Sequence, residues 1–137
     1  MHKENIELQV NRLVYNLGGY LPLMPSSKIN AIANVSFSKK KAMNKFSAFL
    51  QYQYSFKQNR IADYETPTGA YSLVNAGIYF NLHIPYLSAI RFDASVNNLF
   101  DERYYDHLSR YKEEGIYDIG RNFIFKLSIP IHVEERE

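Results

Sequence analysis

The sequence lacks the residues on which several classes of protein depend. None of its 137 residues is cysteine, which excludes disulfide bridges and thiol chemistry. The net charge is only +2 and the basic residues are scattered, so no nucleic-acid partner is expected. The sequence contains no Gly-x-Ser-x-Gly motif, no pair of histidines at metal-ligand spacing and no phosphate-binding loop. We therefore expect neither an enzyme nor a cofactor.

The chain also lacks the long apolar run that forms a transmembrane helix. The stretch from Pro67 to Ile90 has no Asp, Glu, Lys or Arg, but Asn75, Asn81 and Pro85 interrupt it. Much of it alternates with a period of two, which indicates a strand and a turn. No apolar segment of a signal peptide follows Met1. We therefore expect a piece of a longer protein, a mis-started reading frame, or a chain that is not exported.

Aromatic residues are abundant, and the dominant pattern is an alternation of apolar and polar residues. The 12 tyrosines and nine phenylalanines suit β-structure and also a membrane interface. The alternating segments are Ile6–Tyr15, Ile29–Phe37, Phe46–Phe56, Ser72–Leu82, Ile90–Val96 and Phe123–Ile129. No segment has a convincing helical period. The pattern predicts an all-β fold, an antiparallel up-and-down meander of about six strands with negligible helix.

The connections between these segments alternate in length. Ser38–Lys45 and His83–Ala89 are short, whereas Asn16–Lys28, Gln58–Ala70 and Asn98–Gly120 are longer and more polar. In a meander every long connection lies at one end of the sheet and both short turns lie at the other. Short turns at one end and long loops at the other are typical of transmembrane β-barrels of the outer membrane.

Alternation alone does not distinguish a membrane wall from a soluble β-protein, because the same pattern serves both. The loop asymmetry favours the membrane, as do strands near the length needed to span it. Several tyrosines near predicted strand ends suggest an interfacial girdle, namely Tyr15, Tyr54, Tyr71 and Tyr79.

Short motifs near the end of the chain narrow the interpretation further. Asn98-Leu99-Phe100-Asp101, a tyrosine-rich loop and Gly120-Arg121-Asn122 follow one another and lead into the last predicted strand. This order resembles the closing hairpin of TonB-dependent outer-membrane receptors. Asp106-His107-Leu108-Ser109-Arg110 narrows the resemblance to one branch of that family. Similar segments upstream are Leu21–Pro25 and Glu65–Tyr71, so the resemblance covers roughly Gly19 to Ile131.

The resemblance implies that residues 1–137 form the C-terminal segment of a receptor β-barrel, with the plug and the remaining strands absent. A closed barrel of about eight strands only just leaves room for its side chains, so six strands are part of a larger transmembrane barrel. The implied partners are the remaining strands and plug of the same receptor, TonB through the N-terminal part, and outer-membrane lipid. The implied function is import of a scarce metal or metal chelate (a siderophore, zinc or copper) across the outer membrane.

Two other interpretations stay open at this point. A soluble, small ligand-binding β-barrel suits a chain of this length, but it needs more strands and an apolar interior. A small autonomous outer-membrane barrel needs at least eight strands and a signal peptide.

The predicted loop Asn98–Gly120 contains the candidate metal ligands. His107 lies among acidic residues, and a transition metal could bind its imidazole together with Asp106 and Glu102. The Asp-His-Leu-Ser-Arg sequence resembles receptors associated with zinc or copper uptake. The alternative is a solvated extracellular loop without a metal.

The last two predicted strands also suggest a register. If Asn97 lies opposite Asn122, then Asp93 lies opposite Lys126, where the two form a cross-strand ion pair or contact a plug or cargo. The same alternation places Phe123, Phe125, Leu127 and Ile129 on one face with Ile90, Phe92, Ala94 and Val96.

Overall fold

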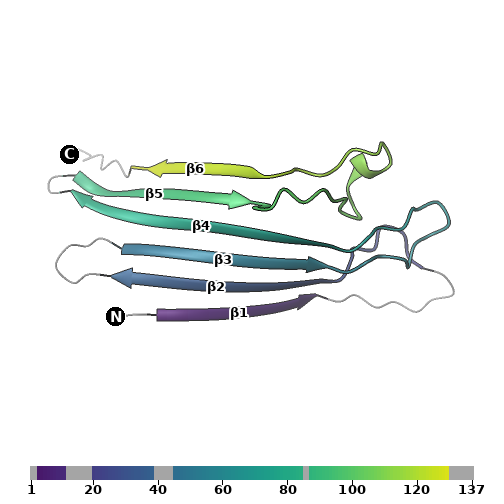
Figure 1. Ribbon diagram of the computed structural model, residues 1–137, viewed down its shortest axis with the longest axis horizontal. Helices are drawn as coiled ribbons and strands as arrows, with labels where there is room; N and C mark the ends of the chain where they lie inside the picture. The colour runs from purple at the N-terminus through teal and green to yellow at the C-terminus, as the bar shows by residue number, and fades with distance from the viewer. Residues whose placement is uncertain (1–2, 12–19, 39–44, 85–86, 130–137) are drawn as a thin grey trace, which may run out of the picture.

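The computed structural model describes residues 3–11, 20–38, 45–84 and 87–129, which form one open, six-stranded antiparallel sheet (Figure 1). Its strands are β1 Lys3–Asn11, β2 Lys28–Ser38, β3 Lys45–Ser55, β4 Tyr71–Ile84, β5 Leu87–Asn97 and β6 Asn122–Ser128. Each strand pairs with its neighbours in sequence, so β1 and β6 are the edges. The one helix of the described residues is a single 3₁₀ turn, η1, at Arg110–Lys112. The prediction of an antiparallel meander with almost no helix is confirmed.

The predicted strands overlap the observed ones, and most of their bounds differ by one or two residues. The first strand begins at Lys3 and not at Ile6, and its predicted end at Tyr15 lies outside the described residues. The turn predicted over His83–Ala89 is wrong in extent, because β4 continues to Ile84 and β5 already begins at Leu87. Pairing persists through a register irregularity between Leu82 and Ile84, so residues read as turn-formers belong to strands. The other predicted short turn, over Ser38–Lys45, has its interior outside the described residues.

The register divides the side chains into two faces, because directly opposed residues of antiparallel strands point to the same side. We call one side the apolar face, which carries three complete rows across β2 to β6. These rows are Phe37–Phe46–Phe80–Phe92–Leu127, Val35–Ala48–Ile78–Ala94–Phe125 and Ala33–Leu50–Ala76–Val96–Phe123. The polar face carries mainly Asn, Gln, Ser and charged side chains, including Asn34, Gln51, Asn75, Asp93 and Lys126.

The pairing of β5 with β6 confirms the predicted register and shared face. Val96, Ala94 and Phe92 lie opposite Phe123, Phe125 and Leu127 respectively. Asn97 lies opposite Asn122 and Asp93 opposite Lys126. The ion pair predicted between those two side chains is absent, however, because Asp93 accepts a hydrogen bond of 2.7 Å from Arg91 Nε on its own strand. Arg91 precedes Asp93 by two residues and therefore lies on the same face.

The apolar face has no second layer over it in the described part of the chain. Phe92 is 52% exposed and Phe125 is 73% exposed, although both lie on a strand with apolar neighbours. Tyr71 is the one buried hydrophobic residue among those whose burial is described, and it lies at the end of the sheet, beside the long loops. The sheet therefore has no hydrophobic core of its own. Within the described ranges, no helix has the length and apolar character needed to cross a membrane.

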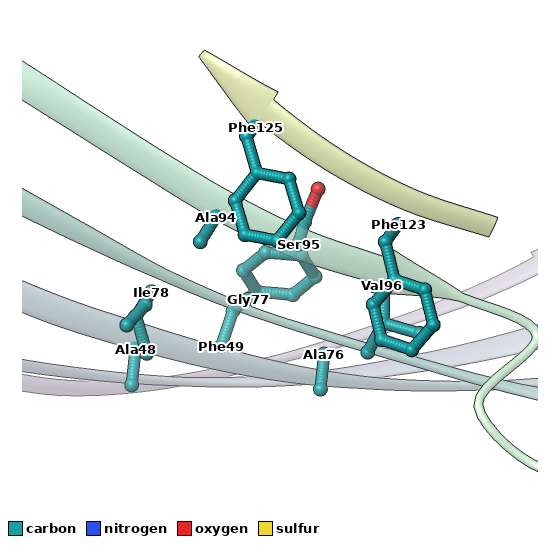
Figure 2. A pocket seen from close by; sticks show the side chains of 10 residues that line it. All are labelled: Ala48, Phe49, Ala76, Gly77, Ile78, Ala94, Ser95, Val96, Phe123 and Phe125. Atoms are coloured by element: carbon teal, nitrogen blue, oxygen red, sulfur yellow. The ribbon is translucent and has the colours of Figure 1, made fainter. Parts of the chain in front are cut away.

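A shallow depression of about 430 Å³ lies on β3 to β6 (Figure 2). Phe123 and Phe125 extend from β6 beside Val96 and Ala94, and the small side chains Ala48 and Ala76 lie further along the sheet. The hollow exists because the small side chains of Ala48, Ala76 and Ala94 lie next to the large rings of Phe123 and Phe125.

Packing on the polar face explains why a glycine occupies position 77 in β4. A Cβ atom at this position would overlap the ring of Phe49, so the ring packs directly on the glycine backbone. The same ring stacks on Tyr79 with centroids 5.7 Å apart, and Arg91 lies over Tyr79.

Only part of the predicted tyrosine girdle lies on the apolar face. Tyr54 does, since it pairs with Ile29. Tyr79 lies on the polar face opposite Ser47 and Asp93, and Tyr71 is buried beneath a loop. Tyr15 is outside the described residues. Period two explains the error, because a tyrosine near a strand end points to the face that its parity dictates.

Candidate functional site

The described parts of the long connections gather at one end of the sheet, where β3 and β5 end and β4 and β6 begin (Figure 1). We call the described parts of these connections, residues 20–27, 56–70 and 98–121, the loop cluster. Its segments are tied to one another by hydrogen bonds, for example Gln58 Nε2 to the Met24 carbonyl at 3.1 Å and Leu23 N to Glu65 Oε1 at 2.6 Å. The predicted placement of the long connections at one end is confirmed for these segments.

Asn98 shapes the start of the 98–121 loop. It has a φ of 51° and Asp101 has a φ of 59°, a left-handed conformation that Asn and Asp tolerate better than most residues. The Asp101 N–H donates to the Asn98 carbonyl at 2.9 Å, which closes a turn at the end of β5. The buried Asn98 side chain accepts from the Glu102 N–H and donates to the Glu102 carbonyl, both at 2.9 Å. The Asn-Leu-Phe-Asp motif is therefore a turn that orders the loop.

Asp101 also joins the two ends of that loop. Its Oδ1 accepts from the Arg121 N–H at 2.8 Å. A Cβ atom at Gly120 would come within 2.8 Å of the same oxygen, so a glycine leaves room for the contact. The Gly-Arg-Asn motif thus meets the Asn-Leu-Phe-Asp motif at the base of the loop, which accords with a role in hairpin geometry.

The Asp106 side chain joins the loop cluster to two strands of the sheet. Its Oδ2 accepts from Lys28 Nζ at 2.6 Å and from the Tyr71 hydroxyl at 2.8 Å. Its Oδ1 accepts from the Leu108 N–H at 3.1 Å. Burial raises the pKa of the carboxyl, but the Lys28 ammonium and the Leu108 and Tyr71 donors outweigh burial and hold the pKa below its ordinary value.

His107, the next residue, is buried. Its Nδ1 lies 2.7 Å from the Thr68 hydroxyl, and its Nε2 has no hydrogen-bond partner among the described residues. Burial lowers the pKa of the imidazole, and the nearby Lys112 lowers it further, while Glu65 and Asp106 oppose the shift. The ring is therefore neutral near pH 7.

The three candidate metal ligands do not form a ligand set in this arrangement. The described residues contain no group of three or more His, Asp or Glu side chains placed to hold a metal ion. Asp106 is bound to Lys28 and Tyr71, His107 to Thr68, and the Glu102 side chain is exposed. A metal site at His107, Asp106 and Glu102 stays a prediction, and forming it would require Asp106 to leave Lys28.

Comparison with known proteins adds no assignment. No protein-family model, no curated protein and no solved structure matches this chain. Interpretation of the site therefore depends on its own geometry. Sequence reasoning did not connect Lys28, Thr68 and Tyr71 with Asp106 and His107, because they lie 35 to 78 residues from these partners.

The buried imidazole predicts a pH dependence of the loop cluster. Because the folded pKa of His107 lies below its ordinary value of 6.5, the neutral ring stabilises the folded loops fully above that value. This contribution is lost as the pH falls from 6.5 through the folded pKa. The Ala62 and Leu23 N–H groups lower the pKa of Glu65, so the stability that this carboxylate contributes is lost only below its ordinary pKa of 4.5.

Amide hydrogen exchange, corrected for its intrinsic pH dependence, measures this effect. Protection of residues 98–121 should fall between about pH 7.5 and about pH 5.5, while that of β3 and β4 stays constant. His107→Gln, which does not titrate, should remove the difference. Equal loss of protection in His107→Gln would contradict the assignment to His107.

Proposed function

We propose that this chain is the C-terminal wall segment of a TonB-dependent outer-membrane receptor, which imports a scarce metal or metal chelate. The observation that carries the proposal is a continuous apolar face with no layer over it. A soluble monomer rarely exposes an apolar patch larger than a few hundred Å². In a transmembrane barrel this face meets lipid and the polar face lines the lumen.

The arrangement of residues on the apolar face supports a membrane position. The phenylalanine row of Phe37, Phe46, Phe80 and Phe92 lies near the short-turn end, and Tyr52 and Tyr54 lie near the loop end. Apart from Phe123 and Phe125 on β6, alanine, valine, leucine and isoleucine fill the rows between them. Outer-membrane barrels carry aromatic residues at the two interfaces, on either side of an apolar zone. The phenylalanine row matches one interface, and the two tyrosines of β3 match the other.

The height of the zone is also suitable. From Phe46 to Tyr54 the chain advances about 26 Å along β3, or about 20 Å after the usual strand tilt, compared with an apolar band of about 25 Å in such barrels. Strands β1 to β5 have 9 to 14 residues, and about 9–11 are needed to span. β6 is shorter, with seven.

Both edges of the sheet support a larger barrel. β1 and β6 each have one side without a strand partner in the described sheet. In lipid an unpaired backbone N–H or C=O group costs several kcal/mol, so the two edges require further strands of the same receptor. On this proposal the plug lies against the polar face, TonB acts through the N-terminal part, and the loop cluster is extracellular.

A soluble ligand-binding barrel has no comparable support in the described sheet. It needs the apolar side chains inside a closed wall, whereas β1 and β6 do not pair and the phenylalanines are exposed.

Membrane extraction and surface labelling test the proposed function. Expressed in a Gram-negative host together with the remaining receptor strands, the chain should stay in the outer-membrane fraction after urea and alkaline washes. Because the sequence has no cysteine, Glu114→Cys in the loop cluster gives a single label site. A membrane-impermeant maleimide should label it on intact cells, with Lys45→Cys at the short-turn end as the unlabelled control. A monomer that stays soluble without detergent, with Phe92 and Phe125 buried, would refute the proposal.

A further inference from the structure

The 98–121 loop covers one particular face of the sheet. Lys28, Ser55 and Tyr71 lie side by side on β2, β3 and β4, since Ser55 pairs with Lys28 on one side and with Tyr71 on the other. Their parity places all three on the polar face, at the loop end. The two hydrogen bonds of the Asp106 side chain to the sheet are both made to this row.

Asp106 spans the central residue of the row. Lys28 and Tyr71, which flank Ser55, both donate to the same carboxylate oxygen, at 2.6 and 2.8 Å. Ser55 is 0% exposed. Ser55 is therefore closed off from solvent beneath a bridge made by a loop side chain.

Further contacts hold the loop on the same side. The ring of Tyr104 lies against that of Tyr71, with centroids 4.5 Å apart. The Asn98 N–H donates to Asn75 Oδ1 on the polar face at 2.9 Å. His107 contacts Thr68, so the 56–70 connection is fastened to the loop beside Asp106.

We propose that residues 98–121 form a strap that is latched across the loop end of the polar face by Asp106 and His107. The latched strap excludes solvent from Ser55 and Tyr71. The role of the strap in transport rests on the proposed function. If the polar face lines the lumen of a barrel, the strap narrows the extracellular mouth of the lumen above β2 to β4. A cargo can pass there only when the hydrogen bonds of Asp106 to Lys28 and Tyr71 open. The latch itself stands on the contacts alone and holds whether or not the chain is part of a receptor.

In this proposal Asp106 and His107 position the strap on the sheet. A carboxylate that satisfies an ammonium and a hydroxyl from two strands fixes the loop in one place, and such charge-assisted hydrogen bonds are stronger than neutral ones. Opening the strap leaves Lys28 without its partner.

A single-cysteine reporter tests the latch in the detergent-solubilised chain. Ser55→Cys places a thiol beneath the bridge, and Ser95→Cys places one on the polar face in mid-sheet, away from the loop contacts described above. N-ethylmaleimide should label Ser55→Cys at least tenfold more slowly than Ser95→Cys. Far-UV circular dichroism checks that each variant keeps its sheet.

Two latch variants are then added to each reporter. Asp106→Asn removes the charge and Thr68→Val removes the hydroxyl beside His107. Each variant should raise the labelling rate of Ser55→Cys about tenfold, because losing one such hydrogen bond shifts the opening equilibrium by about that factor. The labelling rate of Ser95→Cys should not change. Glu114→Gln, an exposed acid-to-amide change on the same loop, should alter neither.

The strap is refuted if Ser55→Cys reacts as fast as Ser95→Cys, or if neither latch variant accelerates it. Thr68→Val changes little volume and guards against a variant that simply fails to fold. A soluble chain that still showed the predicted labelling would refute the proposed receptor function and retain the strap.

Discussion

Ala33→Arg should weaken folding into a bilayer by about 2–4 kcal/mol, the cost of a cationic side chain on the lipid face near the midplane of a barrel. Ala33 lies on the apolar face at the middle of β2, four residues from Phe37 and four from Ile29. The guanidinium would replace an exposed methyl group in the middle of the proposed lipid zone. The urea midpoint of the vesicle-reconstituted receptor measures the loss.

Asn34→Arg is the matched control, because Asn34 is the next residue of β2 and lies on the polar face. A surface substitution of this kind is expected to change stability by less than about 0.5 kcal/mol. Equal losses of stability at both positions, or a larger loss for Asn34→Arg, would contradict the proposal that the apolar face, and not the polar face, meets lipid.

Asn98→Ala should destabilise the 98–121 loop by about 3 kcal/mol, from two hydrogen bonds of about 1 kcal/mol each and about 1 kcal/mol of left-handed backbone strain. The bonds are those between the Asn98 amide and the Glu102 backbone, both in a buried position. Alanine removes both and prefers a negative φ. Hydrogen exchange at the Leu99 and Arg121 amides follows the loss.

Two variants isolate the cause of that effect. Asn97→Ala changes the neighbouring exposed asparagine at the end of β5 and should have little effect. Asn98→Asp keeps the acceptor and the tolerance for positive φ but loses the donor, so its effect should be intermediate. A loss in Asn97→Ala as large as in Asn98→Ala would show that the turn geometry is not what orders the loop.

The period-two pattern is sufficient to predict most of the sheet, because successive side chains of a strand point to opposite faces. Ile29–Phe37 and Phe46–Phe56 correspond to β2 and β3 within a residue or so. Even the β5–β6 register follows from placing Asn97 opposite Asn122. Loop lengths predict which end of the sheet carries the candidate site.

The contacts inside the loop cluster could not be predicted in the same way. Lys28 and Asp106 are 78 residues apart, and no periodicity links a strand end to a position within a loop. The sequence predicts either a metal ligand or a solvated side chain at His107. The side chain is buried against Thr68, and metal binding stays a prediction. The position of His107 depends on how three loops pack together, which the sequence of any one loop does not specify.

Quenching of single tryptophans by brominated lipid tests the central claim, that the apolar face meets lipid, most directly. The sequence has no tryptophan, so Leu50→Trp on the apolar face and Gln51→Trp on the polar face each give one signal. In vesicles with bromine at mid-chain, the reconstituted receptor should show strong quenching for Leu50→Trp and little for Gln51→Trp. Equal quenching at the two positions, or quenching confined to Gln51→Trp, would contradict the account.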